Sequence, residues 1–291
     1  MDSILDDEFV IQMDDSPPFS WIRQTTNRFM TCVVGRKIDH LYVEAAGNAQ
    51  IIATMASDVI GKQKVEVRPF SFHSTGDEIC IISYSGQLKE AIKSVEQSEA
   101  RGIVASSGGM IKSLARKKGW DYVPLPKGYS TSFLFPEIFG CLMSLFGMKV
   151  DIPDLEAFIE KNSPSEIADF NEAKQLASLM ERKRFKILHD AKSEGIARMF
   201  AHMFSTYGGT DTPLEYEPDT KLKPEGGEDN IGIISFSNRG DAGGNKLVGN
   251  FPYNCSSVGG YVKNVIVGEF ASIYLGLLKS KEIELFDREV E

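Results

Sequence analysis

The sequence predicts an α/β fold of two domains, each with a mainly parallel β-sheet covered by helices. Short apolar runs, typical of buried strands, alternate along the chain with segments whose apolar residues recur at helical spacing. The connections between them are mostly short, as they are in doubly wound sheets. The length of 291 residues exceeds that of a usual single domain and fits two.

The first half carries the clearest alternation of strands and helices. Strands are expected at residues 41–43, 65–67, 78–82, 102–105 and 122–125. Helices are expected at residues 48–60, 88–95 and 111–115, and a long apolar helix at residues 133–146. Each helical segment has apolar residues three or four positions apart, which predicts one buried face. This half therefore predicts a flavodoxin-like, doubly wound domain.

The second half repeats the pattern less regularly. Residues 149–165 contain two prolines and predict a connector, which a charged helix over residues 166–183 follows. Further strands are expected at 185–188 and 231–235, and further helices at 195–207 and 262–278. Glycine, proline and acidic residues predict long loops at 207–230 and 237–260. We expect three parts: an N-terminal domain over 1–150, a connector and helix over 151–183, and a C-terminal domain over 184–291.

Composition argues against several functional classes. The net charge of −9 disfavours a nucleic-acid partner, because phosphate backbones are bound by concentrated Lys and Arg. No apolar run approaches the ~20 residues that span a bilayer, and the N-terminus is acidic, unlike a secretory signal. The scattered cysteines and histidines have no metal-ligand spacing, which favours reduced thiols and a cytoplasmic location. We expect no membrane partner, no metal and no cofactor.

Two polar turns stand at the ends of neighbouring strands in the first half. Residues 83–86 read Ser-Tyr-Ser-Gly and residues 106–109 read Ser-Ser-Gly-Gly, and each turn opens a helix. Ligands bind beyond the carboxyl ends of parallel strands, and helix N-termini attract phosphate. Serine is also a preferred N-cap without any ligand, but two such turns at adjacent strand ends favour an anion site. Neither turn has the lysine of a P-loop or a GxGxxG spacing.

These turns and the strands before them resemble the sugar isomerase (SIS) domain. The pattern from residue 41 to residue 153 is similar to the archaeal bifunctional phosphoglucose/phosphomannose isomerase family, and the likeness is faint over residues 185–234. The resemblance implies two SIS-type domains, a phosphorylated sugar as ligand, aldose–ketose isomerase ancestry and a homodimer. The residues predicted to bind the substrate phosphate are Ser83, Ser85, Gly86, Ser106, Ser107 and Gly47.

The chain departs from that family at its catalytic positions. The family's first, glycine-rich loop corresponds to residues 44–49, which keep one glycine and lose the serine. An arginine is expected after the fifth strand, where residues 129–133 have none. The family's catalytic glutamate and histidine have no counterpart at residues 203–209 and 222–229.

The catalytic residues are therefore unknown, and the sequence offers only weak candidates. Glu44 ends the first strand and faces the same crevice as the two turns, although a strand-end carboxylate bonded to a neighbouring turn explains it better than a catalytic base does. His189, with Asp190 beside it, ends the strand at 185–188. Secondary candidates for ligand contacts are Ser130, Thr131, Ser132 and Arg239.

Three hypotheses follow for the function. The leading one is a sugar-phosphate aldose–ketose isomerase, or a diverged relative, that acts on a glucose, mannose or fructose 6-phosphate-like ligand. The alternative is a non-catalytic sensor or regulator that binds a phosphosugar. A third is a structural relic whose crevice is empty.

Overall fold

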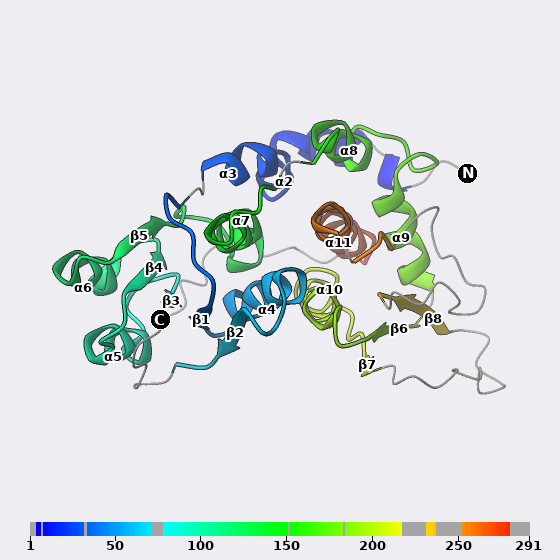
Figure 1. The fold of residues 1–291 in the computed structure, drawn as a ribbon. Coiled ribbons are helices and arrows are strands. Elements are labelled where there is room, and N and C mark those ends of the chain that lie inside the picture. The colour runs from blue at the N-terminus through cyan, green and yellow to red at the C-terminus, as the bar shows by residue number, and fades with distance from the viewer. Residues whose placement is uncertain are drawn as a thin grey trace. The chain divides into compact units, whose positions relative to one another are not determined.

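The computed structural model describes residues 4–6, 8–31, 34–70, 78–150, 152–182, 184–216, 231–236, 252–255 and 257–279 (Figure 1). The chain divides into two compact units. We call the one within residues 25–150 the five-stranded unit, and the one within residues 1–24 and 151–285 the three-stranded unit.

The five-stranded unit contains a wholly parallel sheet. Its strands lie in the order β2 (Val65–Arg68), β1 (Leu41–Glu44), β3 (Ile79–Ile82), β4 (Gly102–Ser106) and β5 (Asp121–Pro124). This order, 2-1-3-4-5, is that of the flavodoxin-like doubly wound sheet. The α/β class and the parallel sheet predicted from the sequence are confirmed.

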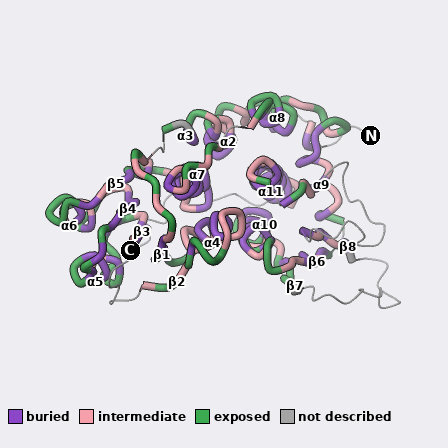
Figure 2. Tube along the Cα trace, in the orientation of Figure 1, coloured by how far each residue is buried: buried purple, intermediate pink, exposed green. Residues whose placement is uncertain are grey.

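Helices cover both faces of this sheet. Figure 1 shows α5 (Lys89–Gln97) and α6 (Gly109–Lys118) on one face, and α4 (Asn48–Ile60) and α7 (Phe135–Leu145) on the other. The remaining elements of the unit are α3 (Thr25–Thr31) and the 3-10 helix η3 (Thr131–Leu134), and both pack against α7. Buried residues alternate with partly buried or exposed ones along α4, α5 and α6, whereas α7 is buried along nearly its whole length (Figure 2).

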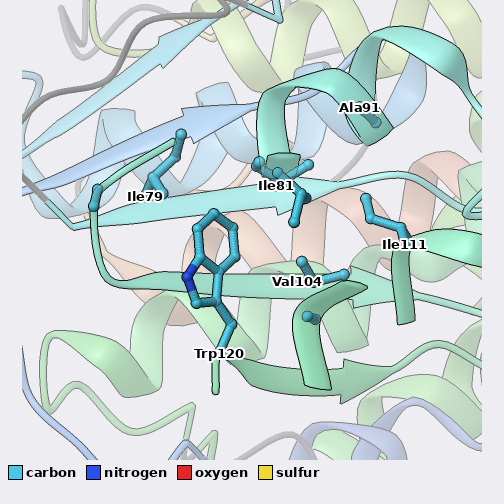
Figure 3. Packing of buried hydrophobic residues seen from close by; sticks show 9 residues of the cluster. Ile79, Ile81, Ala91, Val104, Ile111 and Trp120 are labelled. Atoms are coloured by element: carbon cyan, nitrogen blue, oxygen red, sulfur yellow. The ribbon is translucent and has the colours of Figure 1, made fainter. Parts of the chain in front are cut away.

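The core between the sheet and α5–α6 is formed by isoleucine, valine and alanine side chains and by one tryptophan (Figure 3). Ile79 and Ile81 of β3 and Val104 of β4 are fully buried there. Trp120 closes the core, and its ring fills the space in which a side chain at Gly102 would lie. Because β3 and β4 are covered on both faces, their sequences are continuous apolar runs without alternation.

The three-stranded unit is built around a second parallel sheet. Its strands lie in the order β7 (Leu214–Tyr216), β6 (Arg184–His189) and β8 (Ile231–Ser235). Its helices are, in chain order, η1 (Ile4–Asp6), α1 (Glu8–Gln12), η2 (Met13–Asp15), α2 (Phe19–Arg23), α8 (Leu155–Asn162), α9 (Glu172–Arg182), α10 (Glu194–Thr206) and α11 (Val258–Leu278). Helix α11 packs against α9 and α10.

Three local predictions in the second half were wrong. The predicted connector contains α8, whose buried Leu155, Phe158 and Ile159 have helical spacing. The predicted helix over 166–183 begins only at Glu172, because the side chain of Asn171 accepts a hydrogen bond of 2.9 Å from the Lys174 amide. The predicted loop over 207–230 contains the short strand β7.

Residues 4–6 and 8–24 pack in the three-stranded unit, although the predicted N-terminal domain grouped them with residues up to 150. The ring of Phe19 stacks at 5.9 Å from that of Phe270 and lies 5.5 Å from that of Tyr274, both on α11. Such apolar contacts are not encoded in local periodicity. The domain boundaries at residues 150 and 183 stay predictions.

Among the described residues, one helix is long and apolar enough to cross a membrane by length and composition. It is α11, with 21 residues. Its most apolar stretch is 83% buried inside the protein. That burial is typical of a core helix, and α11 contacts α8, α9 and α10 within its own unit.

Candidate functional site

The carboxyl edge of the five-stranded sheet gathers the predicted phosphate-binding turns. Strand order reverses between β1 and β3, and ligands of doubly wound sheets bind at such a reversal. Because the strands are parallel, the segments that follow β1, β3 and β4 emerge at one edge. These segments carry Gly47, Ser83 to Gly86 and Ser106 to Gly109.

The turns after β3 and β4 are locked together by hydrogen bonds. The backbone amide and the hydroxyl of Ser107 each donate 2.8 Å hydrogen bonds to the carbonyl oxygen of Tyr84. The Ile111 amide in the first turn of α6 donates a 3.1 Å bond to the Gly86 carbonyl. The structure therefore brings the two serine-bearing turns side by side.

Two glycines make this close approach possible. Gly86 has φ of +66° and Gly109 has φ of +72°, in the left-handed region that side chains rarely adopt. A β-carbon on Gly86 would overlap the Gly108 carbonyl oxygen, and one on Gly109 would lie 2.5 Å from the Ser85 carbonyl oxygen. Glycine is thus required at both positions by conformation and by space.

The four serine hydroxyls differ in their partners. The Ser83 hydroxyl makes no hydrogen bond within the described part of the chain, although the residue is only 6% exposed. The Ser85 hydroxyl accepts a 3.2 Å bond from the Gln87 amide. Ser106 donates to the Gly108 carbonyl at 2.9 Å, and Ser107 to Tyr84. Ser106 and Ser107 therefore shape the turns, while Ser83 keeps a hydroxyl available.

Three helices begin at this edge without a side-chain cap. The N-cap residues Gly47 of α4, Leu88 of α5 and Gly108 of α6 make no capping hydrogen bond through a side chain. Open space lies beside Gly47 and Gly108, where a β-carbon would meet no atom within 4 Å. Amide groups at helix starts and the positive ends of the helix dipoles favour an anion in such a position.

The weak catalytic candidate Glu44 lies beneath this edge. Its side chain is fully buried, and its Oε1 atom accepts a 3.2 Å hydrogen bond from Nε of Arg68 at the end of β2. The Arg68 guanidinium also lies 4.2 Å above the centre of the Tyr42 ring. Glu44 is thus held by a neighbouring strand end.

The secondary candidates Thr131 and Ser132 lie next to the start of α4. The side-chain amide of Asn48 donates a 2.9 Å hydrogen bond to Oγ1 of Thr131 and a 3.1 Å hydrogen bond to Oγ of Ser132. The backbone carbonyl oxygen of the neighbouring Ser130 accepts a 2.9 Å hydrogen bond from the Phe133 amide. The loop after β5 is therefore joined to the loop after β1, and no pattern in the sequence indicated Asn48.

Sequence reasoning also missed Arg28. No arginine occurs in residues 129–133, but Arg28 of α3 reaches that segment through space. Its guanidinium donates to the carbonyl group of Phe133 and lies 4.5 Å from the centre of the Tyr129 ring. More than 100 residues separate Arg28 from this loop, so no local pattern indicates the contact.

The remaining candidates belong to the three-stranded unit. His189 ends β6, and its Nδ1 atom lies 3.1 Å from the Asp190 carbonyl oxygen. The Asp190 carboxylate accepts bonds from the Ser193 hydroxyl at 2.9 Å and the Lys192 amide at 2.8 Å. These contacts shape the start of α10. Arg239 lies outside the described residues, within which no group of three or more His, Cys, Asp or Glu side chains could hold a metal ion.

Comparison with known proteins yields one similar curated sequence segment and many similar structures. No family model matches the chain. A segment is 35% identical over 92 residues to D-glucosamine-6-phosphate 4-epimerase of Sulfolobus acidocaldarius. The match covers 29% of this chain and 30% of that enzyme, so the chain matches less than a third of its relative's length.

The structural matches extend over nearly the whole chain. A glucose-6-phosphate isomerase-like protein of Thermus thermophilus superposes with a TM-score of 0.60 at 13% identity, covering 96% of this chain and 94% of that one. Tagatose-6-phosphate ketose/aldose isomerase of Escherichia coli superposes with a TM-score of 0.61 at 10% identity, covering 96% and 95%. At such identities the likeness concerns the fold. The resemblance predicted from the sequence is confirmed at that level: the chain has the α/β fold of these phosphosugar isomerases.

Proposed function

We propose that this chain is a sugar-phosphate-binding protein of the SIS type, which holds the phosphate group at the carboxyl edge of the five-stranded sheet. The observation that carries the proposal is the pair of interlocked turns at residues 83–86 and 106–109. They place an uncommitted hydroxyl on Ser83, the uncapped starts of α5 and α6, and open space at Gly108 at one edge. Ser85, Gly86, Ser106, Ser107 and Gly47 complete the proposed phosphate site.

Related proteins support a phosphosugar as the ligand. The similar proteins named above are a glucosamine-6-phosphate epimerase, a glucose-6-phosphate isomerase-like protein and a tagatose-6-phosphate isomerase. Each of these proteins is named after a hexose 6-phosphate. We therefore propose a hexose 6-phosphate ligand for this chain and an arrangement in two SIS-type domains. A homodimer and a cytoplasmic location belong to the same proposal, and the buried thiols of Cys80, Cys141 and Cys255 suit a reducing compartment.

The activity we propose is aldose–ketose isomerisation of such a ligand, or a diverged reaction on it. This chemistry moves a proton between C1 and C2 of the opened sugar, so it needs a base near those carbons and a donor that stabilises the enediolate. The loss of a positioned base costs ~10²–10⁴ in rate.

One observation favours the alternative, a non-catalytic phosphosugar sensor. Glu44 is the carboxylate nearest in sequence to the proposed site, but it is fully buried and bonded to Arg68. A carboxylate held in this way is poorly placed to accept a proton from a substrate. Binding without turnover is therefore the second candidate function.

A single set of incubations separates the two functions. The protein is mixed with glucose, fructose, mannose or glucosamine 6-phosphate in deuterated water and followed by NMR and by thermal unfolding. Deuterium at C2 supports the isomerase. Stabilisation without exchange supports the sensor, and a ligand at 100 times its Kd should add about 2.7 kcal/mol. The absence of both effects with all four ligands contradicts the proposal.

A further inference from the structure

A buried ion pair joins α3 to α7 in the five-stranded unit. Nε of Arg28 lies 2.6 Å from Oε1 of Glu137, and Nη2 of Arg28 lies 2.6 Å from Oε2. Both residues are buried, with exposed fractions of 8% and 4%. The two side chains therefore meet in the two-pronged geometry that arginine and carboxylates prefer.

The pair lines a cavity of about 270 Å³. Thr31, residues 124–126 and the Tyr129 side chain form the rest of its wall. Most of this wall is apolar or aromatic, and a few polar groups converge on it. Small-molecule sites commonly have this composition.

The cavity adjoins the proposed phosphate site. Its wall begins where β5 ends, and Pro124 is the register partner of Ser106 on β4. The Leu125 amide donates a 2.9 Å bond to the Ser106 carbonyl. Because neighbouring strands lie about 4.8 Å apart, the cavity lies one strand away from the turn at residues 106–109. The Gly128 amide, near the cavity, also donates a 3.1 Å bond to the Tyr84 hydroxyl.

Stability alone is a weak reason for this ion pair. Burying two charges costs desolvation energy that their attraction roughly offsets, and apolar residues of similar volume often serve as well. Within a cavity the same pair can also meet a ligand, because each carboxylate oxygen of Glu137 has a second lone pair beyond its bond to Arg28. The hydroxyl groups on the carbon chain of a sugar can donate hydrogen bonds to these oxygens.

We propose that this cavity binds the hydroxyl-bearing carbon chain of the sugar phosphate, with Arg28 and Glu137 as positioning residues. The inference rests on the proposed function, since it assumes that the phosphate group occupies the turns at residues 83–86 and 106–109. It adds a second subsite, formed by residues that no local motif connects, and assigns sugar selectivity to that subsite.

The test fills the cavity without touching the ion pair. Thr31 lies at the exposed end of α3, so Thr31→Trp adds bulk at the wall with little risk to the fold. Calorimetric titrations compare glucose 6-phosphate with inorganic phosphate, using Ser113→Trp, at an exposed position of α6, as the matched control. We expect glucose 6-phosphate to bind at least tenfold more weakly to Thr31→Trp than to the wild type, whereas the affinity for inorganic phosphate should change less than twofold. The control variant should bind both ligands with the affinities of the wild type.

A second variant removes the charges together. Arg28→Met with Glu137→Met keeps similar volume and leaves no unpaired buried charge, so it should fold and should lose the preference for glucose 6-phosphate over phosphate. Unchanged binding of glucose 6-phosphate by both variants, or an equal loss of both ligands, overturns the inference. A wild type that binds phosphate without preferring the sugar phosphate overturns the inference alone. A wild type that binds neither ligand overturns the proposed function and the inference with it.

Discussion

The hydroxyl of Ser107 donates a 2.8 Å hydrogen bond to the carbonyl oxygen of Tyr84, and this bond joins two turns that lie 23 residues apart in the chain. The Ser107 amide donates to the same oxygen. The turn after β3 is therefore held by the turn after β4, so neither can move without the other. A rigid pair of helix starts is a suitable frame for an anion, because it needs no ordering when the ligand binds.

Replacing Gly86 with alanine should disrupt this frame. A β-carbon there would overlap the Gly108 carbonyl oxygen, and φ of +66° disfavours a side chain. The left-handed conformation alone costs a residue with a side chain roughly 1–2 kcal/mol. We therefore expect the free energy of unfolding, measured in urea, to fall by at least about 2 kcal/mol, and phosphate to bind more weakly. Gly35→Ala is the matched control, because a β-carbon at Gly35 meets no atom within 4 Å. Equal stability of the two variants would contradict this account.

Ser83 and Ser107 should separate ligand binding from stability. The Ser83 hydroxyl has no hydrogen-bond partner among the described residues, so Ser83→Ala should change the free energy of unfolding by less than about 0.5 kcal/mol. It should nevertheless weaken glucose 6-phosphate binding tenfold or more, since a hydrogen bond to a charged group contributes about 1.5–3 kcal/mol. Ser107→Ala loses its bond to Tyr84 and should destabilise the protein by about 1 kcal/mol. Unaltered affinity in Ser83→Ala would remove Ser83 from the site.

Glu44→Gln tests whether the buried carboxylate is structural. The change leaves the Arg68 guanidinium, half-buried over the Tyr42 ring, without its charged partner. We expect a loss of about 1–3 kcal/mol in stability and unchanged affinity for glucose 6-phosphate, measured by urea unfolding and calorimetry. The opposite result, full stability with loss of deuterium exchange at C2, would make Glu44 the base.

Tyr274 should make the three-stranded unit sensitive to alkaline pH. Burial raises the pKa of its hydroxyl well above the usual value of 10, and the hydroxyl donates a 2.8 Å bond to the Asn162 carbonyl. In the unfolded chain the hydroxyl loses its proton near pH 10, whereas the folded chain retains it. The contribution of the Tyr274 hydroxyl to the free energy of unfolding is therefore complete below pH 10 and declines as the pH rises above 10.

The matched variant is Tyr274→Phe, which keeps the ring that stacks on Phe270. Unfolding free energies measured from pH 8 to pH 11.5 should fall less steeply for the variant than for the wild type. Parallel curves would show that Tyr274 does not titrate differently in the two states.

Much of the five-stranded unit was predictable because its signals are local. The buried strands β3 and β4 are continuous apolar runs, and α4 was predicted with its observed bounds of Asn48–Ile60. Gly86 and Gly109 marked turns, as positive φ angles require. The second half was harder, because α8 and β7 are short and their apolar spacing is brief.

The sequence by itself determined the alternation of strands and helices and the polar turns at the ends of β3 and β4, since each depends on residues only a few positions apart. Only the tertiary structure decided that Arg68 holds Glu44 in the interior, that Arg28 reaches Glu137 and Tyr129, and that Phe19 packs against α11. These contacts join residues far apart in the chain. Their partners are selected by the packing of the whole unit and by the need to pair buried charges, which no short window of sequence encodes.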